Sequence, residues 1–227
     1  MAPRSDPRLL VLHGLRLKGL AGAAAIAESA GLSAADVVAC LEGLAAEGLV
    51  VHRDKPAARW SLTPQGRAEH SRLVGQEIDS AGVRPAIEGV YERFRALNTG
   101  VLDACSRWQV RELAGTALVN DHRDPEYDAR VVADLAALHN RVEPLCDDLA
   151  GALDRYRPYR RQLSRAVAKV EAGERDWFTK PVVPSYHTVW FELHEDLLTT
   201  LGLDRTAEAD GPETEAEADA TAPKGVS

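Results

Sequence analysis

Residues 22–66 read GAAAIAESAGLSAADVVACLEGLAAEGLVVHRDKPAARWSLTPQG, and the N-terminal part of the fold can be predicted from this stretch. An alanine-rich helix from Gly22 to about Ala30 ends at Gly31, because a sharp turn favours a left-handed backbone conformation that glycine adopts without a Cβ clash. Ser33 then caps another helix, and Asp36 completes an imperfect capping box three residues later. The order of helix, glycine turn and helix predicts a helix-turn-helix.

A β-hairpin is predicted directly after the helix that starts at Ser33. Leu49–Arg53 has the composition of a strand, and Trp60–Leu62 that of its partner across a short basic loop. Thr63 and Pro64 then predict the start of a further helix, because threonine caps helices and proline fits the first helical position. An earlier helix, with leucines at three- and four-residue steps between Leu9 and Leu20, is expected to pack behind the helix-turn-helix.

The residues around the hairpin form a pattern of leucine, glutamate, glycine and arginine. They are Leu41, Leu44, Glu47-Gly48-Leu49-Val50, Arg53 and Leu62-Thr63-Pro64-Gln65-Gly66-Arg67. This pattern resembles the winged helix-turn-helix of the MarR-type transcriptional regulators and covers about residues 8–75. The resemblance implies a winged helix that binds duplex DNA, and we assign it to a domain spanning residues 1–80.

Residues 81–205 repeat a helical apolar rhythm, and no strand is predicted there. From Arg84 to about Glu112, apolar residues recur every seven positions, as at Ile87 and Trp108. With three further helices, ending near Leu201, this region is predicted to form a bundle of about four helices. The fold class is thus mainly α.

The expected dimer also follows from the resemblance. MarR-type proteins build part of their dimer from a helix ahead of the DNA-binding unit. Here only about seven residues precede the first predicted helix. We therefore expect a homodimer formed through the C-terminal helices.

Composition and charge narrow the class of protein. The chain has 227 residues and a formal net charge of −8. The acidic stretch 206–227 has few large apolar residues and is expected to be disordered.

Three scattered cysteines indicate neither a disulfide framework nor a zinc cluster. No apolar run approaches the roughly 20 residues of a membrane helix, and no signal segment is present, so we expect a cytoplasmic protein.

The predicted DNA contacts come from the helix after the turn and from the wing. They are Ser33, Ala35, Ala39, Arg53, Lys55 and Arg59. The helix between residues 33 and 47 has no Arg, Lys, Asn or Gln to read base edges, and residues 1–80 hold nine basic and nine acidic side chains. The wing should therefore supply most of the affinity. The alternative is a non-enzymatic adaptor whose winged helix docks on a partner protein.

A small-molecule effector site is predicted in the C-terminal region, from a basic stretch at residues 155–169 and an aromatic group further on. The candidate ligand-binding residues are Arg157, Arg160, Arg161, Trp177, His187 and Trp190. The alternative is that the arginines pair with acidic residues of the preceding helix and the aromatic residues are core. No phosphate-binding glycine loop, nucleophile elbow or Cys-x-x-Cys motif is present, so we expect no enzyme, no cofactor and no metal site.

Overall fold

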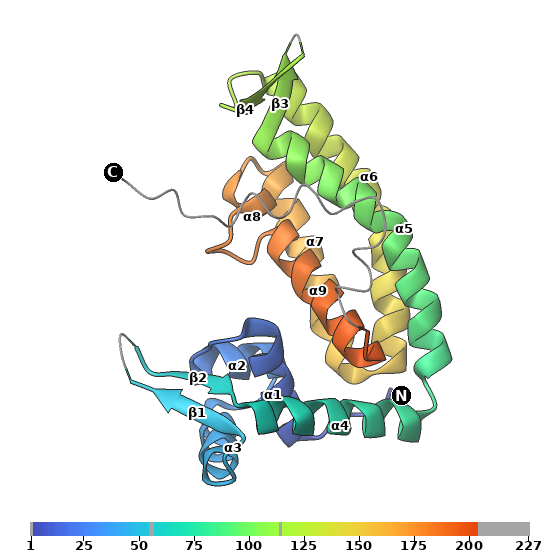
Figure 1. Cartoon of the computed structure of the whole chain (residues 1–227). Helices are drawn as coiled ribbons and strands as arrows, with labels where there is room; N and C mark the ends of the chain where they lie inside the picture. The colour runs from blue at the N-terminus through green and yellow to red at the C-terminus, as the bar shows by residue number, and fades with distance from the viewer. Residues whose placement is uncertain (1, 55–56, 114, 204–227) are drawn as a thin grey trace.

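The structure is a computed structural model that describes residues 2–54, 57–113 and 115–203. The described part is mainly helical, with two short antiparallel hairpins (Figure 1). This confirms the prediction of a mainly helical protein with a small β-hairpin. The tail predicted to be disordered, residues 206–227, lies outside the described residues. The elements are α1 (Pro7–Lys18), α2 (Ala23–Ala30), α3 (Ala34–Ala46), β1 (Val50–Arg53), β2 (Arg59–Leu62), α4 (Pro64–Ala81), α5 (Arg84–Gln109), β3 (Val110–Leu113), β4 (Thr116–Val119), α6 (Pro125–Ala152), the 3-10 helix η1 (Asp154–Tyr156), α7 (Arg157–Glu171), α8 (Asp176–Thr179) and α9 (Tyr186–Leu201).

Glycine and capping residues in the sequence set where the N-terminal helices begin and end. Gly31 ends α2 with φ at 65°, in the left-handed region. The Ser33 hydroxyl accepts a hydrogen bond from the backbone N–H of Asp36 at 3.1 Å and so caps α3. Thr63 caps α4 in the same way, accepting from the backbone N–H of Gly66 at 3.0 Å. Each of these caps satisfies a helix N–H that has no partner within its own helix.

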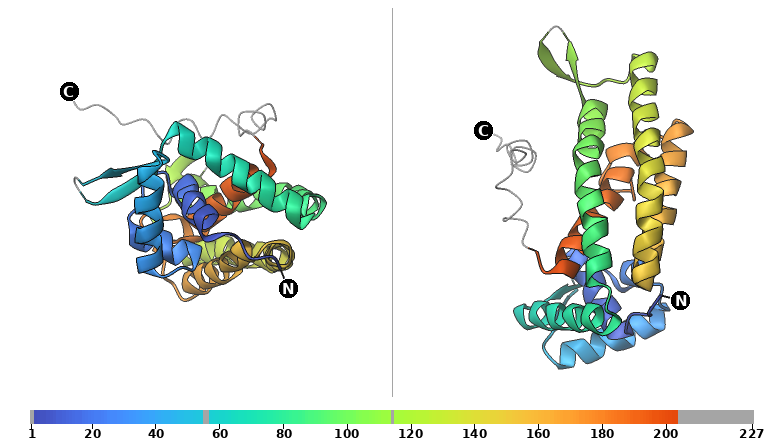
Figure 2. Two further views of the ribbon diagram at one scale, coloured as in Figure 1. Left: turned by 90° about the horizontal axis from the view of Figure 1, so that it is seen from below. Right: turned by 90° about the vertical axis from the view of Figure 1, so that its right-hand side faces the viewer.

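The described residues form two hydrophobic cores, and α4 packs on both. The first gathers the inward faces of α1, α2, α3 and the β1–β2 hairpin, and the second fills the bundle. Leu73 of α4 packs on the first core, whereas Ile78, near the other end of α4, belongs to the second. Figure 2 shows α4 lying across the end of the bundle. One helix therefore contributes to both cores.

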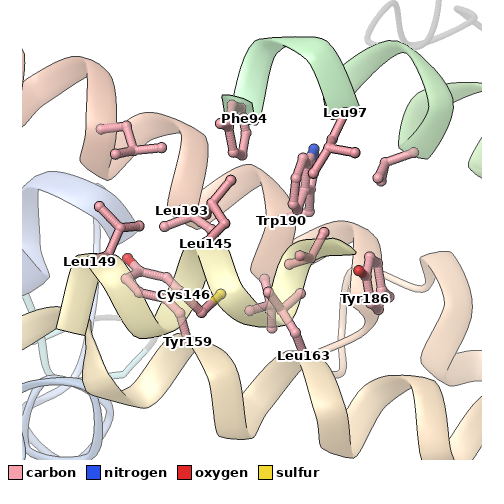
Figure 3. Close-up of a cluster of buried hydrophobic side chains, with 14 of the residues drawn as sticks. Phe94, Leu97, Leu145, Cys146, Leu149, Tyr159, Leu163, Tyr186, Trp190 and Leu193 are labelled. Carbon is pink, nitrogen blue, oxygen red and sulfur yellow. The ribbon is translucent and has the colours of Figure 1, made fainter. Parts of the chain in front are cut away.

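The bundle is built from α5, α6, α7 and α9, with the short α8 at one side. Its centre is aromatic: Phe94 of α5 stacks on Trp190 of α9, with 4.3 Å between ring centroids (Figure 3). Leu145 of α6 and Leu163 of α7 fill the same interior. Gly100 lets α5 and α6 approach closely, because a Cβ there would lie 3.0 Å from the Leu138 side chain.

The β3–β4 hairpin corrects the prediction that residues 81–205 contain no strand. The helix predicted to run to about Glu112 ends at Gln109, and the chain turns back at the end of α5 and α6 (Figure 1). Gly115 adopts a φ of 78° in the turn, which glycine does without strain. The flanking β-branched residues, such as Val110 and Val119, favour strands over helix.

No single helix within the described residues is both long and apolar enough to cross a membrane. The bent pair of α2 and α3 together has the length and composition to do so. The apolar side chains Ile26, Val37 and Leu41 of this pair are fully buried in the first core.

Candidate functional site

The outward face of α3 is open and carries small side chains. Ser33, Ala35 and Ala39, predicted to contact DNA, are all exposed. Ser33 also donates its hydroxyl hydrogen to the Asp36 carboxylate, with 2.7 Å between the oxygens. Val38 lies on this face and is 41% exposed. The face can therefore approach a partner closely, but it offers few groups that form paired hydrogen bonds with bases.

Two arginines lie side by side on the β1–β2 hairpin. Arg53 and Arg59 are directly opposite each other in the antiparallel register, and both are exposed. Within the described part of the chain neither has an ion-pair partner, whereas the neighbouring Asp54 lies 3.3 Å from His52. Lys55, also predicted to contact DNA, lies outside the described residues. The hairpin thus presents two adjacent positive charges that no described carboxylate neutralises.

The acidic residue at the end of α3 is neutralised within the chain. Arg8 of α1 donates from its two terminal nitrogens to the two carboxylate oxygens of Glu47, at 2.6 and 2.7 Å. This pair of hydrogen bonds lowers the pKa of Glu47 and keeps it ionised. The nearby Glu69 of α4 pairs with Arg72 at 2.7 Å. Two carboxylates that would otherwise repel a phosphate backbone are therefore compensated by cations.

Position 66, near the start of α4, has room only for glycine. A Cβ at this position would lie 1.9 Å from the backbone oxygen of Leu49, far inside contact distance. The Thr63 hydroxyl also lies 2.8 Å from the Gly48 oxygen and 3.1 Å from the Leu49 oxygen. On the other side, the backbone of Trp60 in β2 exchanges hydrogen bonds of 2.7 and 3.0 Å with Ala21. The hairpin is thus fixed against both α4 and the segment before α2.

The three arginines of the predicted effector site lie on α7. Arg160 lies 2.7 Å from Asp147 and 3.4 Å from Glu143, so it forms the ion pairs that the alternative interpretation expected. Arg157 pairs with Asp154 at 2.5 Å, and Arg161 is exposed. The basic stretch is therefore partly neutralised by neighbouring carboxylates.

The three other residues predicted to bind an effector lie on α8 and α9. Trp190 is buried in the bundle, where its indole N–H donates to Asn98 at 2.8 Å. Trp177 of α8 lies under the guanidinium of Arg165, 5.0 Å from the ring centroid. His187 is half-buried on α9.

A cluster of buried polar side chains joins the N-terminal helices to the bundle. Arg155 of η1 lies at its centre, with its side chain 2% exposed. The guanidinium donates to Glu77 of α4 at 3.0 Å and to Thr200 of α9 at 2.6 Å, and it forms an ion pair with Asp196 of α9. His13 of α1 reaches the same Asp196 carboxylate, with 3.1 Å between Nε2 and Oδ2. We call these five residues the junction cluster.

The junction cluster holds its central charges in the ionised form. Burial alone would raise the pKa of Asp196, but the neighbouring Arg155 and His13 outweigh burial and hold that pKa well below its usual range. Burial likewise opposes the charge on Arg155, yet Asp196 and Glu77 keep the pKa of Arg155 well above its usual value. His70 of α4 lies 3.0 Å from His13, between Nε2 and Nδ1, and burial lowers the pKa of His70 to about 3.

A small cavity opens beside the junction cluster, between α1 and α7. Its volume is about 40 Å³, and its lining includes His13, Arg155, Asp196, Lys18 and Gln162. A water molecule needs at least 10–15 Å³ of such volume, so about three waters fit. Pockets for drug-sized ligands are roughly 300–1,000 Å³. The cavity is too small for such an effector, and none of the six predicted ligand-binding residues lines it.

Sequence reasoning missed the junction cluster. Its local signal is a polar residue on the apolar stripe of a helix: His13 lies four positions after the buried Leu9, and Asp196 three positions after the buried Leu193. That signal marks a buried polar group but not its partner. His13 and Arg155 are separated by 142 positions in the sequence.

Comparison of the chain with protein-family models, with curated proteins and with solved structures finds no match. No relative therefore supplies a residue role. The roles proposed below rest on the contacts, burial and charges of this chain, because a fold by itself does not specify a function.

Proposed function

We propose that residues 7–81 form a winged helix-turn-helix and that the protein is a transcriptional regulator that binds duplex DNA. The observation that carries the proposal is the arrangement of α2 and α3. The two helices are bent by 113° at Gly31-Leu32-Ser33. DNA-binding helix-turn-helix pairs cross at about 90–120° over a turn of three or four residues that often contains glycine.

The surroundings of this helix pair support the proposal. In a winged helix the second helix of the pair enters the major groove, and the wing reaches the DNA backbone. Here α3 has an open outward face, and Arg53 and Arg59 stand exposed on the adjacent hairpin. Hydrogen bonds from Thr63 to the Leu49 backbone oxygen hold that hairpin against the start of α4.

In the proposed complex, α3 lies in the major groove and the wing arginines contact phosphates. The wing supplies most of the affinity, since α3 lacks the side chains that form paired hydrogen bonds with bases. Because operators with two half-sites require two copies of the reader, the regulator acts as a homodimer held by its C-terminal region. The proposed mechanism requires no small-molecule effector.

Substitution of the wing arginines tests the proposal. Arg53→Ala combined with Arg59→Ala removes two phosphate contacts, so affinity for duplex DNA should fall for every sequence, and the salt dependence should weaken by about one unit of slope for each contact. Arg161→Ala is the matched control, because Arg161 is an exposed arginine on α7. Fluorescence anisotropy with labelled duplexes measures both quantities. Unchanged binding by the double variant would contradict the proposed role of the wing.

A second function, docking on a partner protein, is favoured by the chemistry of α3. Its exposed face includes Ala35, Val38 and Ala39, which contact apolar surface well and bases poorly. A Val38→Glu variant should abolish such docking, whereas the wing double variant should leave it largely intact. The two functions thus depend on different side chains of the same domain.

A further inference from the structure

The β3–β4 hairpin at the far end of α5 and α6 exposes large hydrophobic residues in an unusual concentration. Val110, Leu113 and Leu118 are each more than 40% exposed, and Val119 is 82% exposed. Because side chains alternate along a strand and opposite residues share a face, Leu113 and Leu118 lie on one face of the hairpin and Val110 and Val119 on the other. Each face of the hairpin therefore carries two exposed large apolar residues.

The base of the hairpin is fixed, although its strands are open. Arg111 pairs with Asp124 at 3.0 Å and lies over the ring of Tyr127, 4.9 Å from its centroid. The segment that follows β4 is also anchored, because the Asn120 side chain donates to Asp128 at 3.0 Å. Isolated two-stranded hairpins are marginal in water, and a further strand stabilises them.

The outer edge of β4 is suited to pairing with another strand. Thr116–Val119 contains no charge and no proline, and all four residues are exposed. Sheet edges in natural proteins are commonly protected by charges, prolines or bulges. The edge of β4 has none of these protections.

The charges around the hairpin are balanced within the chain. A depression beside Leu118 and Val119 is rimmed by Arg111, Arg123, Asp121 and Asp124, and these form two ion pairs, Arg111–Asp124 at 3.0 Å and Arg123–Asp121 at 3.5 Å. The patch therefore has no net charge that would repel a second copy of itself. It lacks the excess positive charge that would favour a nucleic acid.

We propose that two copies of this chain associate by pairing β4 with the partner's β4, which joins the two hairpins into a four-stranded antiparallel sheet. The symmetry selects β4 over β3. A two-fold axis at the middle of β3 would place Arg111 opposite the partner's Arg111, or Glu112 opposite the partner's Glu112, and like charges directly opposite destabilise a sheet. An axis at Ala117 or Leu118 of β4 places only uncharged residues opposite each other.

The inference goes beyond the proposed function and is tested on the protein alone. Standard stable interfaces bury about 800 Å² on each partner, and a four-residue strand pairing is a small part of that. The expected dimer is therefore weak, with a dissociation constant in the micromolar range, roughly 1–100 μM.

Sedimentation velocity of the full chain over this range of concentrations tests the inference. We expect a reversible monomer–dimer equilibrium, and a Leu118→Asp variant should stay monomeric because the charge would be buried against its symmetry mate. Leu20→Asp is the matched control, since Leu20 is similarly exposed but lies between α1 and α2. A wild-type chain that stays monomeric, or a Leu118→Asp variant that still dimerises, would overturn the inference.

Cysteine cross-linking identifies which strand edge pairs in the dimer and does not depend on whether the Leu118→Asp variant folds. Ala117→Cys and Leu118→Cys probe β4, and Glu112→Cys probes β3 opposite Ala117 in the hairpin. Mild oxidation should link one of the β4 variants covalently and leave the Glu112→Cys variant unlinked, because only β4 lies within disulfide reach of its own copy. Equal linking of the β3 variant would overturn the choice of edge. A dimer that forms as described but binds no duplex would remove the proposed function and leave this inference standing.

Discussion

The hairpins at the two ends of the bundle differ in how far they are buried. At the junction end, the β1–β2 hairpin buries Val50 and Leu62, and it is hydrogen-bonded to the segment before α2. At the far end, no residue of β3 or β4 is buried. The first hairpin packs against its own chain, whereas the second projects from the end of α5 and α6 with an uncharged and exposed β4 strand (Figure 1).

The contrast separates surfaces that the chain covers by itself from surfaces that it leaves exposed. At the junction end, the charged side chains of Arg155 and Asp196 are buried and paired with each other. Buried charges require such partners, and here the chain itself supplies them. The far end leaves large apolar side chains uncovered. Isolated exposed hydrophobic residues are ordinary, but a contiguous group of them marks an interaction surface. Substitutions should therefore affect stability at the junction end and association at the far end.

The largest effect is expected from breaking the junction cluster. Arg155→Ala leaves the buried carboxylates of Asp196 and Glu77 without their cation, which should lower the free energy of unfolding by about 3–5 kcal/mol. Urea denaturation followed by circular dichroism measures this change. Arg161→Ala, at an exposed position of the adjoining helix, should shift stability by less than about 0.5 kcal/mol. Equal effects of the two variants would show that the junction cluster contributes no special stability.

The next largest effect is expected where β1 meets α4. Gly66→Ala places a methyl group against the Leu49 backbone oxygen, so the hairpin or the helix must shift, at a cost of about 1–3 kcal/mol. Gly75→Ala is the control, because a Cβ there meets no other atom within 4 Å and alanine favours helix. Thermal unfolding should show a lower melting temperature for the first variant and an unchanged or higher one for the second.

Acid should weaken the junction end through His70. The pKa of His70 is lowered in the folded protein to about 3, below its usual 6.5, because the ring is buried near His13, Arg155 and Arg16. The unfolded chain therefore binds more protons between these values, so stability is full above pH 6.5 and falls as the pH drops toward 3. Between pH 7 and pH 5 the loss from this group is about 2 kcal/mol.

Urea denaturation of the wild type and of His70→Leu at both pH values checks this prediction. The Asp196 carboxylate, whose pKa is held low, adds its loss only at more acidic pH. The variant should lose less stability than the wild type between pH 7 and pH 5. The same pH dependence in both proteins would place the responsible group elsewhere.

The smallest effect on stability is expected at the far end. Leu118→Asp should change the free energy of unfolding of the monomer by less than about 0.5 kcal/mol, because surface substitutions away from buried contacts seldom do more. Dilute samples, below the dissociation constant of any dimer, isolate this effect. A loss of several kcal/mol in the monomer would mean that the hairpin packs on its own chain, which would erase the contrast between the two ends.

The parts of the fold that sequence analysis anticipated are those with local signals. Ser33 and Thr63 each cap the helix predicted after them, and Gly31 ends α2 in the left-handed conformation expected of it. Helix caps depend on neighbours within three or four residues, so a short stretch of sequence contains the whole signal. The described strands β1 and β2 likewise follow from the turn between two short apolar runs.

The parts of the structure that were not predicted depend on contacts between residues far apart in the sequence or on patterns too short to interpret. The helical spacing that ends at Trp108 runs into Val110–Leu113, and a strand of four residues is too short to show a period of its own. The junction cluster brings together side chains from α1, α4, η1 and α9, and no local pattern specifies which of them meet. The effector residues stay a prediction, because they were chosen for their chemistry and no observation tests whether a ligand binds them.

A salt titration of affinity for the DNA upstream of the protein's own gene and for a scrambled duplex of equal length tests the proposed DNA binding. We expect preference for the upstream duplex and an affinity that falls linearly with salt on a logarithmic scale, with a slope that counts the phosphate contacts. Absence of binding to either duplex at about 50 mM salt, where screening is weak, would contradict it.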